Sequence, residues 1–115
     1  MLAAIKSEAS ANQAILDESF KPYFKDGLVL RELSVGTVSQ YLANALFNQY
    51  ATPNAIEVLN IYLRNLKLAN AYRARIERSQ MESEGEKFLE SIIKNWDKNL
   101  KLCEANIEEI IRLDG

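Results

Sequence analysis

Toward its C-terminal end the chain carries a run of apolar residues with the spacing of a helix that packs along another helix. Successive members are separated by 4, 3, 4, 3, 4 and 3 residues. They are Leu89, Ile93, Trp96, Leu100, Cys103, Ile107 and Ile110. Gaps that alternate between three and four place these side chains on one narrow stripe of an α-helix, the a/d seam of coiled-coil packing. The seam predicts a helix over about residues 86–113 that lies lengthwise against a second helix.

Residues 54–80 are the predicted partner of this helix. Thr52 and Pro53 precede them and make a typical helix start, because a threonine hydroxyl caps a helix and proline is tolerated at its first position. The stretch MESEGEK at 81–87 contains the one glycine between residues 37 and 114, so we expect the turn there. The result is an antiparallel hairpin roughly 40 Å long at 1.5 Å per residue. A single helix that runs on through Gly85 is the alternative.

The N-terminal half is predicted to supply two more helices. The first covers about residues 2–19, and one face of it carries an inner stripe. The stripe consists of Ile5, Ala9, Gln13, Leu16 and Phe20. A short helical turn at 28–33 follows, and then a second helix that Ser34 caps and that runs to about Ala51. Its predicted core-facing residues are Val38, Leu42 and Ala45. The sequence therefore predicts one all-α domain, residues 1–115, built like a four-helix bundle whose last two helices form the long hairpin.

Apolar residues cover about half the circumference of helix 54–80, which is more than one antiparallel partner can bury. They are Leu59, Tyr62, Leu63, Leu66, Ala69, Tyr72 and Ile76. Either the first two helices cover this apolar arc, or a second subunit does. Arg73 projects from the middle of the arc, where an unpaired charge is costly, so it needs a carboxylate partner or an interface. We expect a homodimer whose interface residues are Tyr62, Leu66, Tyr72 and Arg73.

The residue types that many catalytic and metal sites need are absent. The chain has no histidine and one cysteine, Cys103, which excludes Ser-His-Asp and Cys-His catalysis, two-histidine zinc motifs and CxxC redox pairs. The four glycines stand apart in the sequence, so there is no glycine-rich phosphate loop. We therefore expect a protein that is not an enzyme and that has no cofactor and no metal ion. Cys103 lies on the seam, where we expect a small core residue and not a nucleophile.

Charge and hydropathy indicate a protein that works in water. Fourteen basic and sixteen acidic residues give a net charge of −2, which provides no global attraction to nucleic acid or to an anionic membrane. The longest apolar runs fall far short of the roughly 20 residues that span a bilayer. The start, MLAAIKSEAS, lacks the apolar region of a signal peptide. We expect a cytoplasmic protein with no membrane partner.

The stretch LSVGTVSQYLAN at 33–44 suggests a second function. Serine followed by Thr-Val-Ser and an apolar pair resembles the second helix of the helix-turn-helix in lactose-repressor-type and LuxR-type bacterial regulators. The matching residues are Ser34, Thr37, Val38, Ser39, Tyr41 and Leu42. The resemblance implies that Ser34 contacts a phosphate, while Thr37 and Gln40, with Val35 and Gly36, face base edges. A basic stripe on helix 54–80, opposite the apolar arc, could add phosphate contacts: Arg64, Lys67, Arg75 and Arg78.

Two functions therefore remain open. The first is a small helical protein that acts by binding another protein, as an adaptor, inhibitor or assembly subunit. The alternative is a helix-turn-helix-like regulator that binds nucleic acid through residues 34–44 and the basic stripe.

Overall fold

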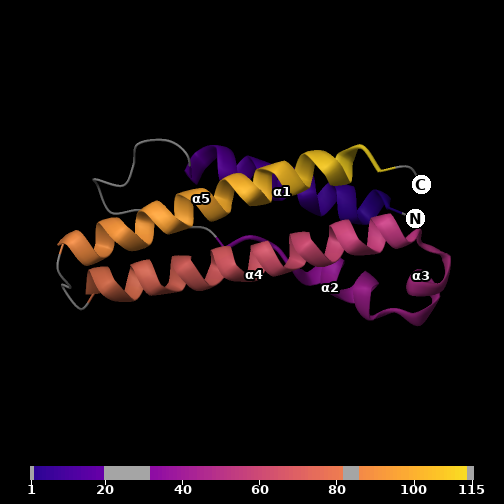
Figure 1. Ribbon diagram of the computed structural model, residues 1–115, viewed down its shortest axis with the longest axis horizontal. Helices are drawn as coiled ribbons and strands as arrows, with labels where there is room; N and C mark the ends of the chain where they lie inside the picture. The colour runs from indigo at the N-terminus through magenta and orange to yellow at the C-terminus, as the bar shows by residue number, and fades with distance from the viewer. Residues whose placement is uncertain (1, 20–31, 82–85, 114–115) are drawn as a thin grey trace.

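The computed structural model describes residues 2–19, 32–81 and 86–113, with side chains placed at 2–17, 32–78 and 91–113. Within these residues there are five α-helices and no strand, which confirms the predicted all-α fold (Figure 1). The helices are α1 (Ala3–Ser19), α2 (Gly36–Ala43), α3 (Ala45–Tyr50), α4 (Pro53–Met81) and α5 (Glu86–Ile111). The molecule is elongated, 49 Å long and 22 and 18 Å across.

The long hairpin is confirmed. α4 and α5 run antiparallel and share the most extensive contact in the molecule. α4 begins as predicted, because Thr52 Oγ1 accepts a hydrogen bond from the backbone N–H of Ala55 at 3.1 Å and Pro53 occupies the first helical position. The described seam residues of α5 are buried, except that Ile93 is half-buried. The buried ones are Trp96, Leu100, Cys103, Ile107 and Ile110. Gly85 and the side chain of Leu89 lie outside the described residues.

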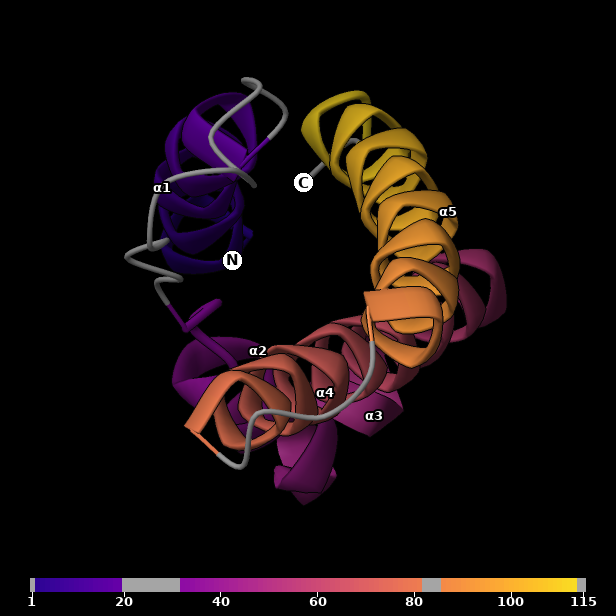
Figure 2. The ribbon, with the colours of Figure 1, turned by 90° about the vertical axis from the view of Figure 1, so that its left-hand side faces the viewer.

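Four helices surround one core, in the order α1, α5, α4 and α2 (Figure 2). α1 packs against α5 on one side and α2 on the other, and α2 in turn packs on α4. The predicted inner stripe of α1 points into this core: Ile5, Ala9 and Leu16 are buried and Gln13 is half-buried. Phe20 lies outside the described residues. The bundle is incomplete along its length, because α2 has 8 residues and α4 has 29.

The predicted second helix, from Ser34 to about Ala51, is wrong at its N-terminal cap and in its continuity. It breaks at Asn44, whose backbone is extended (φ −87°, ψ 122°), so that α2 ends at Ala43 and α3 starts at Ala45. Asparagine favours such breaks because its side chain competes for backbone hydrogen bonds. Val38 is buried and Leu42 is half-buried as expected, but the break turns Ala45 out into solvent. The predicted turn at 28–33 lies mostly outside the described residues, and Glu32 and Leu33 are not helical.

The structure also decides what covers the apolar arc of α4. Leu59, Tyr62, Leu66 and Ile76 have no exposed surface, and Ala69 is 1% exposed. These residues belong to one core cluster with buried residues of α1, α2 and α5. The chain's own helices therefore cover most of the arc, as the first of the two alternatives predicted, and leave Leu63 and Tyr72 half-buried.

Candidate functional site

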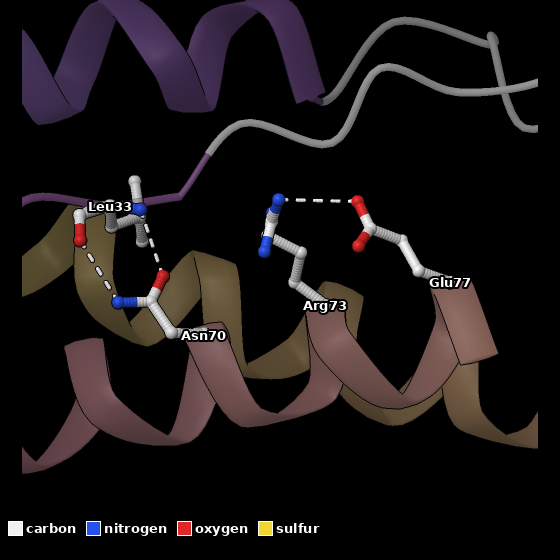
Figure 3. A network of polar contacts seen from close by, with 4 residues as sticks. All are labelled: Leu33, Asn70, Arg73 and Glu77. Atoms are coloured by element: carbon white, nitrogen blue, oxygen red, sulfur yellow. Dashed lines mark hydrogen bonds and ion pairs between the residues drawn. The ribbon is translucent and has the colours of Figure 1, made fainter.

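The entrance to α2 is held by two asparagine side chains, Asn70 of α4 and Asn12 of α1. Asn70 Oδ1 accepts from the backbone N–H of Leu33 at 2.8 Å, and Asn70 Nδ2 donates to the carbonyl of Leu33 at 2.9 Å (Figure 3). Asn12 does the same to the next residue: Oδ1 accepts from Ser34 N–H at 2.8 Å and Nδ2 donates to Ser34 O at 2.9 Å. We call this pair the amide clamp.

The amide clamp fits the geometry of an extended backbone. In an extended chain both polar groups of one residue point the same way, and those of the next residue point the opposite way. The segment runs between α1 and α4, so Leu33 faces one helix and Ser34 the other. Each asparagine thus bonds the N–H and the carbonyl of one residue, as a neighbouring β-strand would, and satisfies backbone groups that are partly buried.

Glu8 of α1 caps α2 from outside the helix. Its Oε2 accepts from the N–H of Thr37 at 2.8 Å and from Ser34 Oγ at 2.8 Å, and its Oε1 accepts from the N–H of Val38 at 3.2 Å. A carboxylate is stabilising here because the first N–H groups of a helix are unpaired and carry partial positive charge. The expectation that Ser34 caps this helix is wrong. Val35 is the N-cap residue, without a side-chain cap, and the Ser34 hydroxyl donates to Glu8.

The break between α2 and α3 is stabilised by two more amides. Asn44 Oδ1 accepts from the N–H of Phe47 at 3.0 Å and so caps α3. Asn48 Nδ2 donates to the carbonyls of Leu42 and Asn44, both at 2.8 Å. These bonds set the angle at which α3 leaves α2. Phe47 then enters the core while the rest of α3 faces outward.

The outward side of α2 and α3 forms a shallow pocket of about 320 Å³. Its lining residues, which we call the neutral face, are Tyr41, Asn44, Leu46, Phe47 and Tyr50. Tyr41 and Phe47 stack edge to face, with ring centroids 5.3 Å apart and planes at 79°. Leu46 is 64% exposed and Tyr50 68% exposed, and these are the two most exposed large apolar side chains among the described residues.

The neutral face carries no formal charge, and neither does the sequence around it. Residues 33–56 contain no Asp, Glu, Lys or Arg, although such residues make up 26% of the chain. Leu46 and Tyr50 were not among the predicted interface residues, because a continuous helix over 34–51 gives no reason to expect them together in solvent. The missing charge was the signal that could have found this surface.

The residues expected at a dimer interface lie elsewhere in the structure. Tyr62 and Leu66 are fully buried inside the chain, while Tyr72 and Arg73 are half-buried. Arg73, with its side chain 23% exposed, forms an ion pair with Glu77 of the same helix at 3.2 Å (Figure 3). The carboxylate that Arg73 requires is therefore supplied within α4, and these four residues do not form one exposed surface.

The residues of the nucleic-acid alternative are partly brought together. Ser34 and Thr37 meet at the Glu8 carboxylate, and Gln40 is exposed on α2. The four residues of the basic stripe are all exposed on α4: Arg64, Lys67, Arg75 and Arg78. A phosphate at the N-terminus of α2 would have to displace Glu8, which already holds the N–H groups and repels a second anion.

Two titratable groups are fully buried, Tyr62 on α4 and Cys103 on α5. Burial raises the pKa of the Cys103 thiol from 9.0 to about 12. Burial also raises the pKa of Tyr62, although the hydrogen bond that Asn12 Nδ2 donates to the Tyr62 hydroxyl, at 2.8 Å, opposes the shift. A thiol with a raised pKa is a poor nucleophile, because the thiolate is the reactive form. Cys103 is a core residue, as its place on the seam predicted.

Among the described residues, no three Cys, Asp or Glu side chains are grouped as a metal site requires. None of the helices in the described part of the chain is both long enough and apolar enough to cross a membrane. Comparison with protein-family models, curated proteins and solved structures finds no match to this chain.

Proposed function

We propose that this protein acts without catalysis, by binding another protein through the neutral face of α2 and α3. The observation that carries the proposal is the exposure of Leu46 and Tyr50 beside the pocket. Tyrosine is one of the residue types that carry most of the binding energy at protein–protein interfaces, and Leu46 extends the apolar surface beside Tyr50. The exposure of these two apolar side chains to water does not stabilise the fold, and a neighbouring pair of this kind is typical of a surface that binds a partner.

The way α2 and α3 are held supports a binding role. The amide clamp and Glu8 fix the start of α2, and Asn44 and Asn48 fix the angle of α3. A surface that is already ordered before binding loses less conformational entropy when a partner arrives. The nucleic-acid alternative is less well supported, because Glu8 occupies the helix N-terminus where the resemblance would put a phosphate.

The experiment is comparative capture from an extract of the source organism. The wild type is compared with Leu46→Asp and with Leu102→Asp, which changes an exposed leucine of α5 instead (56% exposed). We expect proteins that bind the wild type and Leu102→Asp but not Leu46→Asp. Capture of DNA that is weakened by salt and by replacing Arg64 and Lys67 would favour the alternative instead.

A further inference from the structure

We infer that the neutral face binds the neutral face of a second copy of this chain across a two-fold axis. The inference rests on the proposed function, since it names the partner of the same surface. It moves the expected homodimer away from Tyr62 and Leu66, which are buried, to α2 and α3.

Charge favours a second copy over a charged partner. A two-fold axis places residues near the axis opposite their own counterparts, so any charge there meets a like charge. The neutral face avoids this cost, because residues 33–56 are uncharged. A self-contact along the basic stripe of α4 would instead bring like charges together, since Arg64, Lys67, Arg75 and Arg78 are all exposed there. A strongly acidic or basic partner would gain no ion pairs from the neutral face.

Shape favours the same partner. A self-complementary interface needs a projecting side chain and a recess on one patch, because residue i of each copy contacts residue j of the other. Leu46 and Tyr50 project, and the pocket that they border has the Tyr41–Phe47 aromatic pair in its wall. Phe47 is 4% exposed, so the half-buried Tyr41 is the ring of this pair that a further aromatic side chain can contact. We expect Tyr50 of each copy to pack against this pair in the other.

The size of the patch sets the expected strength. A standard interface uses about 20–30 residues from each partner. By comparison, α2 is 8 residues long and α3 is 6 residues long. The association is therefore expected to be reversible, with a dissociation constant in the micromolar range.

Sedimentation equilibrium from roughly 1 to 200 μM covers that range. We expect the average mass of the wild type to rise from 13.1 kDa toward twice that value. Leu46→Asp and Tyr50→Asp should stay at the monomer mass, since each would place two carboxylates near the axis. Leu102→Asp is the matched control and should still dimerise. Circular dichroism and thermal unfolding establish that the variants are folded, as the exposure of all three side chains predicts.

Chemical cross-linking provides a second measurement that does not depend on a disruptive variant. Cys103 is fully buried and is therefore protected from maleimides, so a Gln49→Cys variant has one reactive thiol, on the exposed side of α3. A short bis-maleimide should link two copies of Gln49→Cys efficiently and two copies of Lys67→Cys poorly. Equal yields at both positions would indicate random collision and overturn the inference.

The outcomes separate this inference from the proposed function. A wild type that stays monomeric at the highest concentration overturns self-association. If Leu46→Asp also loses a captured protein, the neutral face still binds a different partner and the proposed function stands. A dimer that Leu102→Asp abolishes and Leu46→Asp leaves intact places the interface on the hairpin and overturns the inference. A monomer that captures no protein through Leu46 contradicts both.

Discussion

The buried polar side chains of the described residues are all asparagines, and they are not equally satisfied. They are Asn12, Asn65, Asn99 and Asn106. In Asn12 the amide oxygen accepts from Ser34 N–H, and the amide nitrogen donates to the Ser34 carbonyl and to the Tyr62 hydroxyl. Asn65 of α4 donates to Asn106 Oδ1 of α5 at 2.7 Å, so a polar pair bridges the hairpin. Asn99 Nδ2 donates to the Asn65 carbonyl at 3.3 Å, but Asn99 Oδ1 is buried without a hydrogen-bond partner.

We predict that Asn99→Leu stabilises the protein by about 1 kcal/mol, since it removes a buried acceptor that has no partner and fills the space with an apolar group. Asn106→Leu should do the opposite, because it leaves the Asn65 amide unpaired inside the hairpin. Urea denaturation of both variants and the wild type measures the difference. Loss of stability in Asn99→Leu would mean that Oδ1 has a partner, such as a bound water.

Trp96 is the one tryptophan of the chain. It lies on the seam of α5 and is 3% exposed, so Trp96→Ala should lower the free energy of unfolding by about 3–5 kcal/mol. Leu102→Ala, on the exposed side of the same helix, serves as the control and should cost far less. Native fluorescence emission at the wavelength of an exposed indole would contradict this position for Trp96.

α2 is a short helix whose start is held in place by side chains of α1 and α4. It has two turns, too few for a helix that is stable in isolation. Glu8 supplies its cap, and the amide clamp fixes the chain that enters it.

We therefore predict that Glu8→Ala lowers the free energy of unfolding by about 1–3 kcal/mol, the cost of unpaired helix N–H groups that had bonded to a charged acceptor. The amides of Thr37 and Val38 should exchange with solvent faster, which hydrogen-exchange NMR detects residue by residue. Glu109→Ala removes an exposed carboxylate of α5 and should change stability by less than about 0.5 kcal/mol. Equal effects of the two variants would show that Glu8 contributes little to α2.

These elements also show what can be predicted from this sequence. The hairpin was predictable because its signals are local and periodic: a seam on α5 and the Thr52–Pro53 start of α4. Asn99 and Asn106 are seven residues apart, and each directly precedes a seam residue. This spacing indicated buried polar residues beside the seam, but only the apolar residues were considered. The amide clamp was beyond such patterns, because Asn12 and Asn70 lie 22 and 37 residues from the backbone they bind. The break at Asn44 was missed because asparagine is tolerated within helices and its preference for breaks is weak.

The two buried weak acids, Cys103 and Tyr62, are expected to make the free energy of unfolding fall at alkaline pH. Cys103 and Tyr62 keep their protons more tightly in the folded chain than in the unfolded one, because burial raises both pKa values. Stability should be unaffected by these groups below about pH 9, the ordinary pKa of the thiol. Above it, the unfolded chain loses protons that the folded chain retains, so the free energy of unfolding falls.

We predict that the wild type loses stability between pH 9 and about 12, the interval between the unfolded and folded pKa of Cys103. Each such group contributes a slope of up to about 1.4 kcal/mol per pH unit. Cys103→Ala should remove one contribution and flatten the curve, which denaturation at a series of pH values measures. Identical slopes for the two proteins would contradict the pKa assigned to the thiol.

The contact between the first helix and the last has a consequence for how this chain acquires its fold. α1 packs on α5, and Lys6 Nζ donates to the carbonyl of Leu113, 107 residues along the chain. The ribosome therefore releases α1 long before it synthesises α5. During that interval the apolar stripe of α1 is exposed to water or bound by a chaperone. α4 and α5 follow one another in the chain, so their contacts span shorter separations in sequence than those between α1 and α5 and are expected to form sooner. We expect the folding nucleus to lie in the hairpin and the docking of α1 to complete folding, so that α1, which is synthesised before the hairpin, is ordered after it.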